Sequence, residues 1–443
     1  MDVLEVTRHE ARRKIMVIDS KSFYASVESV DRQLNPLKSL LVVMSQQANT
    51  NGGLVLAASP RAKAELGISN VMRQRDVPKD PRLMIVNPRM NRYIEMNKKV
   101  NDIFRRFVAE EDLHLYSIDE SILDVTDSWQ YWQSKFGKNL TLKGLARQIQ
   151  LAVKQELGLY LTVGIGDTPA MAKLALDLEA KHDFNLMGEW HFEDLPNKLW
   201  PITNLEDVWS IGRKTAQTLK RLGIFSMKDL ALYNPYQLKE KLGVRGEELY
   251  ALSWGVDRSI LHQRHYVKDA SISNSQVLPR DYQQADEIKV VIREIGEQIS
   301  GRLRSQHKMA RSLSLSVGYS YATSQQKRQH GFNVQTTITA TNQSHTIAAA
   351  LLELFDCYYE SGAVRNIGVS AGQLQAEHGE QLDLLTPVRE QVNRSKLDNV
   401  IDDIRRKFGV TSLVKLSSLS PGGTMIQRAG LVGGHNGGNA YGQ

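Results

Sequence analysis

A strand-like apolar run is interrupted by two adjacent carboxylates in the stretch Leu115-Tyr116-Ser117-Ile118-Asp119-Glu120-Ser121-Ile122-Leu123-Asp124-Val125. Side chains alternate between the two faces of a regular strand, so Asp119 and Glu120 can converge on one site only if the chain bends there. The pattern therefore predicts a hairpin tip rather than the centre of a strand. Carboxylates at such a position suit Mg²⁺, which takes oxygen ligands and usually keeps several waters and substrate phosphates. The same two residues could also be a solvated turn, and this stretch alone leaves both interpretations open.

Composition bounds the class of protein. The chain has 443 residues, of which 41% are hydrophobic, enough for roughly two to four domains with ordinary cores. Its single cysteine, Cys357, cannot form an intramolecular disulfide, and the N-terminus lacks the apolar core of a signal peptide. No apolar run approaches the roughly 20 residues that a bilayer demands. We therefore expect a cytoplasmic protein with no membrane partner.

Charge indicates a partner. The formal net charge of +7 and the isoelectric point near 9.2 favour a polyanion. Many basic proteins bind no nucleic acid, however, so charge alone does not decide the question.

A third acid ends another apolar run. Residues 14–19 have the pattern of a buried strand that delivers Asp19 at its carboxyl end. If neighbouring strands bring Asp19 to the pair at 119 and 120, three carboxylates could hold two cations roughly 3.5–4 Å apart, as in an in-line phosphoryl displacement. Asp124 falls within the outgoing strand and is interpreted as structural.

The rest of the chain divides by texture. Strand and helix patterns alternate up to about residue 200, including a small inserted subdomain with strands at 39–45 and 53–58 and a helix at 60–66. Short helices with glycine and asparagine turns follow to about residue 261, and then a compact α+β unit with helices at 285–305 and 346–359. The last part is polar, with one amphipathic helix at 395–408 and a glycine-rich stretch at 433–438 that we expect to be disordered unless bound.

The motif Asp19-Ser20-Lys21-Ser22-Phe23-Tyr24-Ala25-Ser26-Val27-Glu28, followed later by Ser117-Ile118-Asp119-Glu120, closely resembles the Y-family of translesion DNA polymerases. It is most similar to the bacterial UmuC/ImpB-type branch. The resemblance implies that Asp19, Asp119 and Glu120 are catalytic carboxylates that bind two Mg²⁺ ions, with the backbone carbonyl of Ser20 as a further ligand. It also implies an error-prone, template-directed DNA polymerase that extends a primer past damaged bases during DNA repair and the SOS response.

The resemblance also assigns residues to the incoming deoxynucleoside triphosphate. Tyr24 matches the steric gate, an aromatic ring that excludes a ribose hydroxyl by a clash rather than by an added attraction. Phe23 lies beside it, although both could be core aromatics, and this holds more readily for Phe23.

Residues 56–63 occupy the position of the fingers motif that contacts the triphosphate. The usual tyrosine is absent. The resemblance assigns the hydroxyl of Ser59, which lies in its place, to the nucleotide, and Arg61 and Lys63 are rival cations, of which we favour Lys63. Residues 164–181 resemble the palm helix whose terminal lysine, here Lys181, reaches the phosphates. A lysine at a helix end could instead simply complement the helix dipole.

Two regions resemble DNA-binding elements. Residues 210–216 look like a helix-hairpin-helix, in which Gly212 lets backbone amides approach a phosphate while Arg213 and Lys214 add charge. An ordinary packing corner between two helices would have a similar sequence. Residues 271–375 resemble the little finger, where basic residues would follow the DNA backbone. The candidates are Arg302, Arg304 and Arg311.

The segment Gln381-Leu382-Asp383-Leu384-Leu385 resembles the peptide by which bacterial polymerases dock on the sliding clamp. Two leucines filling an apolar pocket beside a hydrogen-bonding glutamine are the physical basis of such docking. The segment could instead pack on its own domain. An accessory subunit or a recombinase filament is a further possible partner.

We therefore predict a multidomain α+β polymerase shaped like a right hand. The predicted parts are a palm (1–30 and 85–200), small fingers (31–84), a helical thumb with the helix-hairpin-helix (201–262), a little finger (270–375) and a partly disordered, partner-binding C-terminal region (376–443). The alternatives are a catalytically inactive, clamp-associated DNA-binding factor and, less favoured, a nucleotidyl cyclase that uses paired acids and two metals.

Overall fold

The computed structural model describes residues 3–45, 53–263, 270–377, 388–432 and 435–436. The chain forms two compact units. One comprises Met1–Met44, Leu54–Met72 and Asp76–Arg264, and the other comprises Ser45–Gly53, Arg73–Arg75 and His265–Gln443. Each is described by itself. In the described part of the chain, no helix has the length and apolar character needed to cross a membrane.

A five-stranded sheet in the order β5-β6-β1-β7-β8 is the centre of the first unit. Strand β1 runs antiparallel to both of its neighbours, β6 and β7, whereas β7 and β8 are parallel. Because β1 is central and covered, its run Ile-Met-Val-Ile is wholly buried, as the sequence predicts. The strands are β1 (Ile15–Ser20), β5 (Leu113–Leu115), β6 (Glu120–Asp124), β7 (Leu161–Gly166) and β8 (Met187–Trp190).

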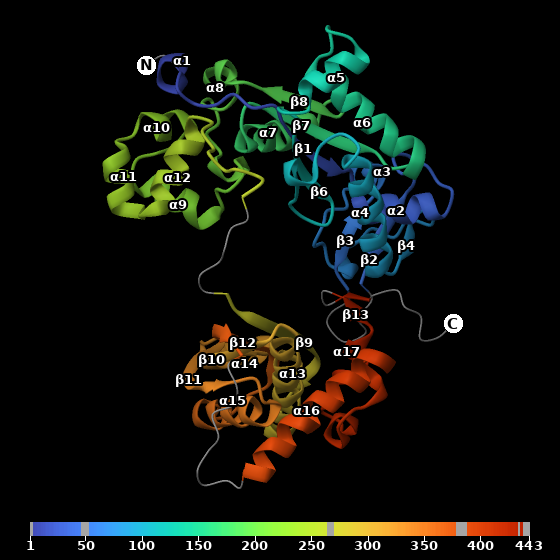
Figure 1. Ribbon diagram of the computed structural model, residues 1–443, viewed down its shortest axis with the longest axis vertical. Coiled ribbons are helices and arrows are strands. Elements are labelled where there is room, and N and C mark those ends of the chain that lie inside the picture. The colour runs from blue at the N-terminus through green and yellow to red at the C-terminus, as the bar shows by residue number, and fades with distance from the viewer. Residues whose placement is uncertain (1–2, 46–52, 264–269, 378–387, 433–434, 437–443) are drawn as a thin grey trace. The chain divides into compact units, whose positions relative to one another are not determined.

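Helices cover this sheet on either side of β7 and β8 (Figure 1). Helix α7 (Pro169–Ala175) continues into a π-helical turn (Leu176–Ala180) and packs on β1, β7 and β8, while α6 (Leu142–Leu157) packs on β7 and on α4 (Met90–Phe104). Gly164 permits the close approach of α7, since a Cβ there would lie 2.1 Å from the carbonyl oxygen of Ala172. Ile15 and Val17 pack under α7, so strand alternation places Asp19 on the same face.

The inserted subdomain is a three-stranded sheet in the order β3-β2-β4, with a small core of its own. Helix α2 packs on β2 and β3, and α3 follows β3 directly. The two predicted strands and the predicted helix are confirmed. The elements are α2 (Phe23–Asp31), β2 (Leu41–Met44), β3 (Val55–Ala58), α3 (Pro60–Leu66) and β4 (Met84–Val86).

Short helices complete the first unit. Their core is continuous with α7 and includes Trp200 and Trp254, whose rings meet edge to face at 5.3 Å. These helices are α8 (Leu195–Lys198), α9 (Arg213–Arg221), α10 (Met227–Leu232), α11 (Pro235–Leu242) and α12 (Val244–Ser253); α1 (Val3–Thr7) and α5 (Trp129–Phe136) lie earlier in the chain.

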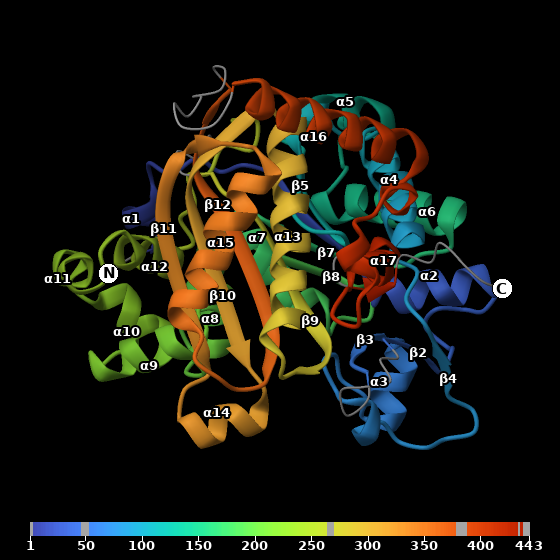
Figure 2. The ribbon, with the colours of Figure 1, turned by 90° about the horizontal axis from the view of Figure 1, so that it is seen from below.

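The second unit contains a four-stranded antiparallel sheet in the order β11-β10-β12-β9. Figure 2 shows α13 and α15 side by side over this sheet. The predicted α+β unit is therefore confirmed. Its elements are β9 (Ile272–Tyr282), α13 (Ala285–Ser305), β10 (Lys308–Tyr319), α14 (Tyr321–Lys327), β11 (Gly331–Thr341), α15 (Ser344–Tyr358) and β12 (Val364–Ala376).

The C-terminal segment is folded against this unit rather than separate from it. The predicted amphipathic helix is present as α16 (Val388–Phe408), and α17 (Met425–Ala429) precedes the short strands β13 (Leu431–Val432) and β14 (His435–Asn436). Thr424 donates from its backbone and its hydroxyl to the buried carboxylate of Glu294 on α13, and Met425 is buried. Most of the glycine-rich stretch for which we expect disorder lies outside the described residues.

Candidate active site

The adjacent carboxylates lie where a hairpin turns. Strands β5 and β6 are antiparallel, and the backbone N–H groups of Tyr116 and Ser117 both donate to the carbonyl oxygen of Glu120, at 3.0 and 2.9 Å. Asp119 lies in the bend before β6, and its carbonyl oxygen accepts from the backbone N–H of Ser20 at 2.8 Å. The predicted hairpin tip is confirmed, and this last bond ties it to the end of β1.

The third predicted carboxylate lies beside this pair. Asp19 is the direct cross-strand partner of Glu120, and both lie on the face that α7 covers. Burial raises the pKa of Asp19 to about 6; the charges of Lys181 and Lys173 oppose this shift, while those of Asp119 and Glu120 add to it. Three acids thus share a partly buried site where negative charge is costly, which favours a bound cation.

Glu120 has a cation of its own in this structure. It is only 8% exposed, and its Oε1 accepts from the Nζ of Lys173 on α7 at 2.5 Å. Burial raises the pKa of Glu120, and the bond to Lys173 opposes this effect. Consistent with this pairing, no three His, Cys, Asp or Glu side chains of the described residues converge closely enough to hold a metal. The all-oxygen donors and their net charge nevertheless fit a hard divalent cation.

The predicted gate residue lies on an aromatic platform. Tyr24 is half-buried and stacks on Tyr93 of α4, with ring centroids 4.4 Å apart and planes at 16°. Burial and the charge of Asp119 raise the pKa of Tyr24. Phe23 is buried beside it, as the core interpretation of Phe23 expects. Tyr93 is not among the site residues predicted from the sequence, and its stack on Tyr24 connects it with the site.

The structure separates the two rival cations on α3. Arg61 points away from the carboxylates, because it donates to Glu65 at 2.6 Å and to the carbonyl oxygen of Lys38 at 3.1 Å. The charges of Asp19 and Lys181 both act on Lys63, whose pKa is lowered by partial burial of its ammonium, with Asp19 opposing. Lys63 is therefore the cation that faces the acids.

We expect Lys63→Ala to raise the KM for the incoming nucleotide about 10–100-fold, because one charge-assisted contact is worth about 1.5–3 kcal/mol. Arg61→Ala is the matched control, and its exposed ion pair should contribute less than about 1 kcal/mol. Steady-state insertion kinetics measure both. A larger effect from Arg61→Ala would reverse the assignment.

Ser59 is a correction. Its hydroxyl is fully buried, donates to the carbonyl oxygen of Ser39 at 2.6 Å and accepts from the N–H of Ala62 as the N-cap of α3. These bonds occupy the hydroxyl within the protein, so the structure argues against the predicted nucleotide contact. Its role is to begin the helix that carries Lys63.

Two further lysines, which are not among the residues predicted from the sequence, lie at the candidate site. Lys21 donates from Nζ to the carbonyl oxygen of Lys181 at 3.3 Å, and its pKa is lowered by burial while the charge of Asp19 opposes. Lys173 is the partner of Glu120. Lys21 lies in the motif that begins at Asp19, and Lys173 lies in the predicted palm helix at 164–181. The available signal in the sequence was the position of these two cations in motifs that resemble the active site. Lys181, which was predicted, pairs with Asp177 at 2.7 Å.

The residues predicted to form a helix-hairpin-helix lie at the exposed N-terminus of α9. Gly212 is the N-cap of α9, and a Cβ there would meet nothing within 4 Å. Arg213 and Lys214 follow on the first turn and are exposed. Ser210 adopts a left-handed conformation with φ 76° and is held by Arg245 from the start of α12. This arrangement leaves the glycine amide and both cations accessible to a phosphate.

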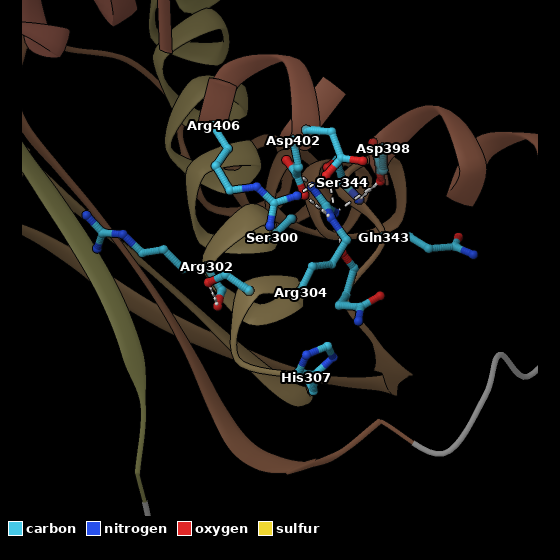
Figure 3. A network of polar contacts seen from close by, with 12 residues as sticks. Ser300, Arg302, Arg304, His307, Gln343, Ser344, Asp398, Asp402 and Arg406 are labelled. Carbon is cyan, nitrogen blue, oxygen red and sulfur yellow. Dashed lines mark hydrogen bonds and ion pairs between the residues drawn. The ribbon is translucent and has the colours of Figure 1, made fainter. Parts of the chain in front are cut away.

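Arg304 is a second correction. Figure 3 shows it pointing from α13 to α16, where it donates to Asp402 at 2.6 Å and to Asp398 at 3.2 Å. The guanidinium also donates to the hydroxyl of Ser344 and the carbonyl oxygen of Asn342. This largely buried network anchors α16, so the structure argues against the predicted DNA contact.

Arg302 and Arg311 remain exposed. In Figure 3, Arg302 points away from the Arg304 network. It donates to the carbonyl oxygen of Ser273 at 3.3 Å. These two arginines therefore stay as predictions. The predicted clamp peptide, 381–385, lies outside the described residues.

We expect Arg304→Met to lower the free energy of unfolding of the second unit by about 2–4 kcal/mol, because it leaves Asp398 and Asp402 without their cation. Arg302 lies two residues earlier on the same helix. Arg302→Met should change the free energy of unfolding by less than about 1 kcal/mol, but it should weaken DNA binding and reduce the salt dependence of that binding. Urea unfolding and DNA binding at several salt concentrations measure the two effects. The opposite pattern would restore Arg304 as a DNA contact.

Comparison with known proteins identifies the family of the chain. The impB/mucB/samB family matches residues 18–177, its C-terminal domain matches residues 269–384, and the helix-hairpin-helix motif of the same family matches residues 193–224. The chain belongs to the Y-family of DNA polymerases, in its impB/mucB/samB branch, and is classed with DNA-directed DNA polymerases.

Individual relatives cover almost the whole chain. The putative UV-damage repair protein UvrX of Bacillus subtilis (strain 168) is 38% identical over 425 residues, which are 96% of this chain and 98% of the relative. DNA polymerase IV 2 of the same organism is 32% identical over 95% of this chain and 98% of its own. DNA polymerase IV of Pelotomaculum thermopropionicum is 30% identical over 95% and 98%.

Proposed function

We propose that this protein is an error-prone translesion polymerase that extends a primer past damaged template bases during DNA repair and the SOS response. The observation that carries the proposal is the pairing of the end of β1, which carries Asp19, with the β5–β6 hairpin, which carries Asp119 and Glu120, beside lysines from α3 and from the end of the π-helical turn. Nucleotidyl transfer requires carboxylates that hold metal ions and, opposite them, basic side chains that hold the phosphates.

Asp19, Asp119 and Glu120, with the carbonyl of Ser20, would hold two Mg²⁺ ions. When bound, these ions lower the pKa of the attacking 3′-hydroxyl and neutralise charge on the triphosphate. The protein's own groups do the rest. Lys63 and Lys181 orient the phosphates, and the ring of Tyr24, braced by Tyr93, lies against the sugar.

The folded parts support assignment to a right hand. The five-stranded sheet with α7 would be the palm, the small β3-β2-β4 layer with α3 the fingers, helices α9 to α12 the thumb, and the β11-β10-β12-β9 sheet the little finger. Fingers this small would leave a roomy site, which favours tolerance of damaged bases. Gly212, Arg213, Lys214, Arg302 and Arg311 would contact the DNA backbone, and 381–385 would dock on a sliding clamp.

Primer extension by the full-length protein on damaged and undamaged templates, with and without clamp, tests the proposal. We expect templated products across a lesion, and longer ones with clamp. Cyclic nucleotide without a template would support the cyclase instead, and DNA binding with no synthesis would support the inactive clamp-associated factor.

A further inference from the structure

Four charged side chains form an alternating chain that leads away from the acidic site. Lys173 lies between two acids, with its Nζ 2.5 Å from Oε1 of Glu120 and 3.3 Å from Oδ2 of Asp177. Asp177 in turn accepts from Nζ of Lys181 at 2.7 Å. Each contact is a direct ion pair, so a change at Glu120 has a continuous path of charges to Lys181.

Local structure holds this chain in place. Lys173 lies on α7, and Asp177 follows it by four residues in the π-helical turn. Lys181 follows Asp177 by four residues, just after the turn, where its N–H donates to the carbonyl oxygen of Leu176 at 3.2 Å. The turn is fixed to the sheet by three buried residues, which are Ala172, Leu176 and Ala180. The two four-residue spacings thus place Lys173 and Lys181 on the same carboxylate, that of Asp177.

The two ends of the chain differ in exposure. Glu120 and Lys173 are 8% and 9% exposed, so their pair is shielded from solvent, whereas the side chain of Lys181 is 40% exposed. A shielded pair is hard to break unless another charge replaces the one that leaves. An exposed pair four residues apart contributes little and is readily exchanged.

We propose that Lys173 is a stand-in cation, which neutralises Glu120 until a divalent metal binds and then transfers to Asp177. The inference rests on the proposed function, because it takes Glu120 as a metal ligand. An arriving divalent cation repels the ammonium that shares the Glu120 carboxylate, and Asp177 is already within ion-pair reach. Once Asp177 receives Lys173, its hold on Lys181 weakens, and Lys181 becomes available to a phosphate. Metal loading would thereby prepare the phosphate-binding lysine.

Mn²⁺ binding to the full-length protein on primer-template DNA, with no nucleotide present, tests this by electron paramagnetic resonance. Removing the competitor in Lys173→Met should tighten Mn²⁺ binding at least about fivefold, the lower end of typical coupling between ligands. Removing the acceptor in Asp177→Asn should weaken it by a similar factor, about fivefold. Lys173→Arg keeps a cation at Glu120 and should stay near the wild type.

A second ion pair on the same turn supplies controls for net charge. Lys198 and Glu179 pair at 2.9 Å beside Trp190, so Lys198→Met and Glu179→Gln repeat the two charge changes elsewhere. Both should leave Mn²⁺ binding within about twofold of the wild type.

Unchanged or weaker binding in a folded Lys173→Met would overturn the inference, as would an Asp177→Asn that matches Glu179→Gln. If Lys173→Met does not fold, the Asp177→Asn comparison decides. Failure of the proposed function looks different, since the wild-type complex itself would then bind no Mn²⁺.

Discussion

The double substitution Asp119→Asn with Glu120→Gln is expected to reduce the rate of primer extension at least about a thousandfold, a loss of about 4 kcal/mol of transition-state stabilisation. The amides keep the shapes of the carboxylates but remove two of the three negative charges carried by the hairpin tip and the end of β1. On the proposed function, the site would then no longer hold the divalent cations that the reaction needs. Single-turnover extension of an undamaged template in Mg²⁺ measures the effect.

Asp124→Asn is the matched control for this variant. Asp124 lies on the same strand, β6, but at its far end, where its carboxylate accepts from the backbone N–H of Thr126 at 3.0 Å. An asparagine oxygen can accept the same bond, so extension should stay within about threefold of the wild type. Equal losses in the control and in the double variant would indicate damage to the hairpin and would speak against a catalytic role of the pair.

The second large effect concerns the sugar. Tyr24→Ala should reduce discrimination against ribonucleotides by about 10–100-fold, because relief of a steric clash is worth about 1–3 kcal/mol. The ring is held in place by its stack on Tyr93, so its removal would leave a space where the proposed function puts the sugar. Insertion of a ribonucleotide and of the matching deoxynucleotide opposite the same template base gives the ratio.

Tyr24→Phe is the control here, because it keeps the ring and the stack on Tyr93 and removes only the hydroxyl. It should retain most of the discrimination. If Tyr24→Ala discriminates as well as the wild type, another group excludes the ribose hydroxyl and Tyr24 is not the gate.

The local structure around the candidate site is predicted correctly from the sequence, because local patterns define it. The apolar run before Asp19 needs only to be recognised as a buried strand, and the pair at 119 and 120 needs only a bend. The sequence favours Lys63 only narrowly over Arg61 as the phosphate-binding cation, because both lie on one short helix. The direction of Arg61 depends on its ion pair with Glu65, four residues further on.

The predicted contacts that the structure argues against belong to side chains that are already bonded within the protein. Arg304 is a basic residue in a basic region, which favours a DNA contact. Its partner Asp402 lies 98 positions later, on α16, and no local sequence pattern reveals that α16 packs on α13. Ser59 stands in a nucleotide-binding motif by position but is consumed by the cap of α3. Lys173 was part of a quoted motif, and only the packing of α7 on the sheet shows that it faces Glu120.

The central claim is that the acids at β1 and the hairpin tip catalyse templated nucleotide transfer. Its most direct test is single-turnover insertion of each deoxynucleotide opposite each template base, by the wild type and by Asp19→Asn. The account predicts that the wild type inserts preferentially the nucleotide that pairs with the template, and that Asp19→Asn is slower by at least about a hundredfold. Insertion that ignores the template, or an Asp19→Asn variant within about threefold of the wild type, would contradict it.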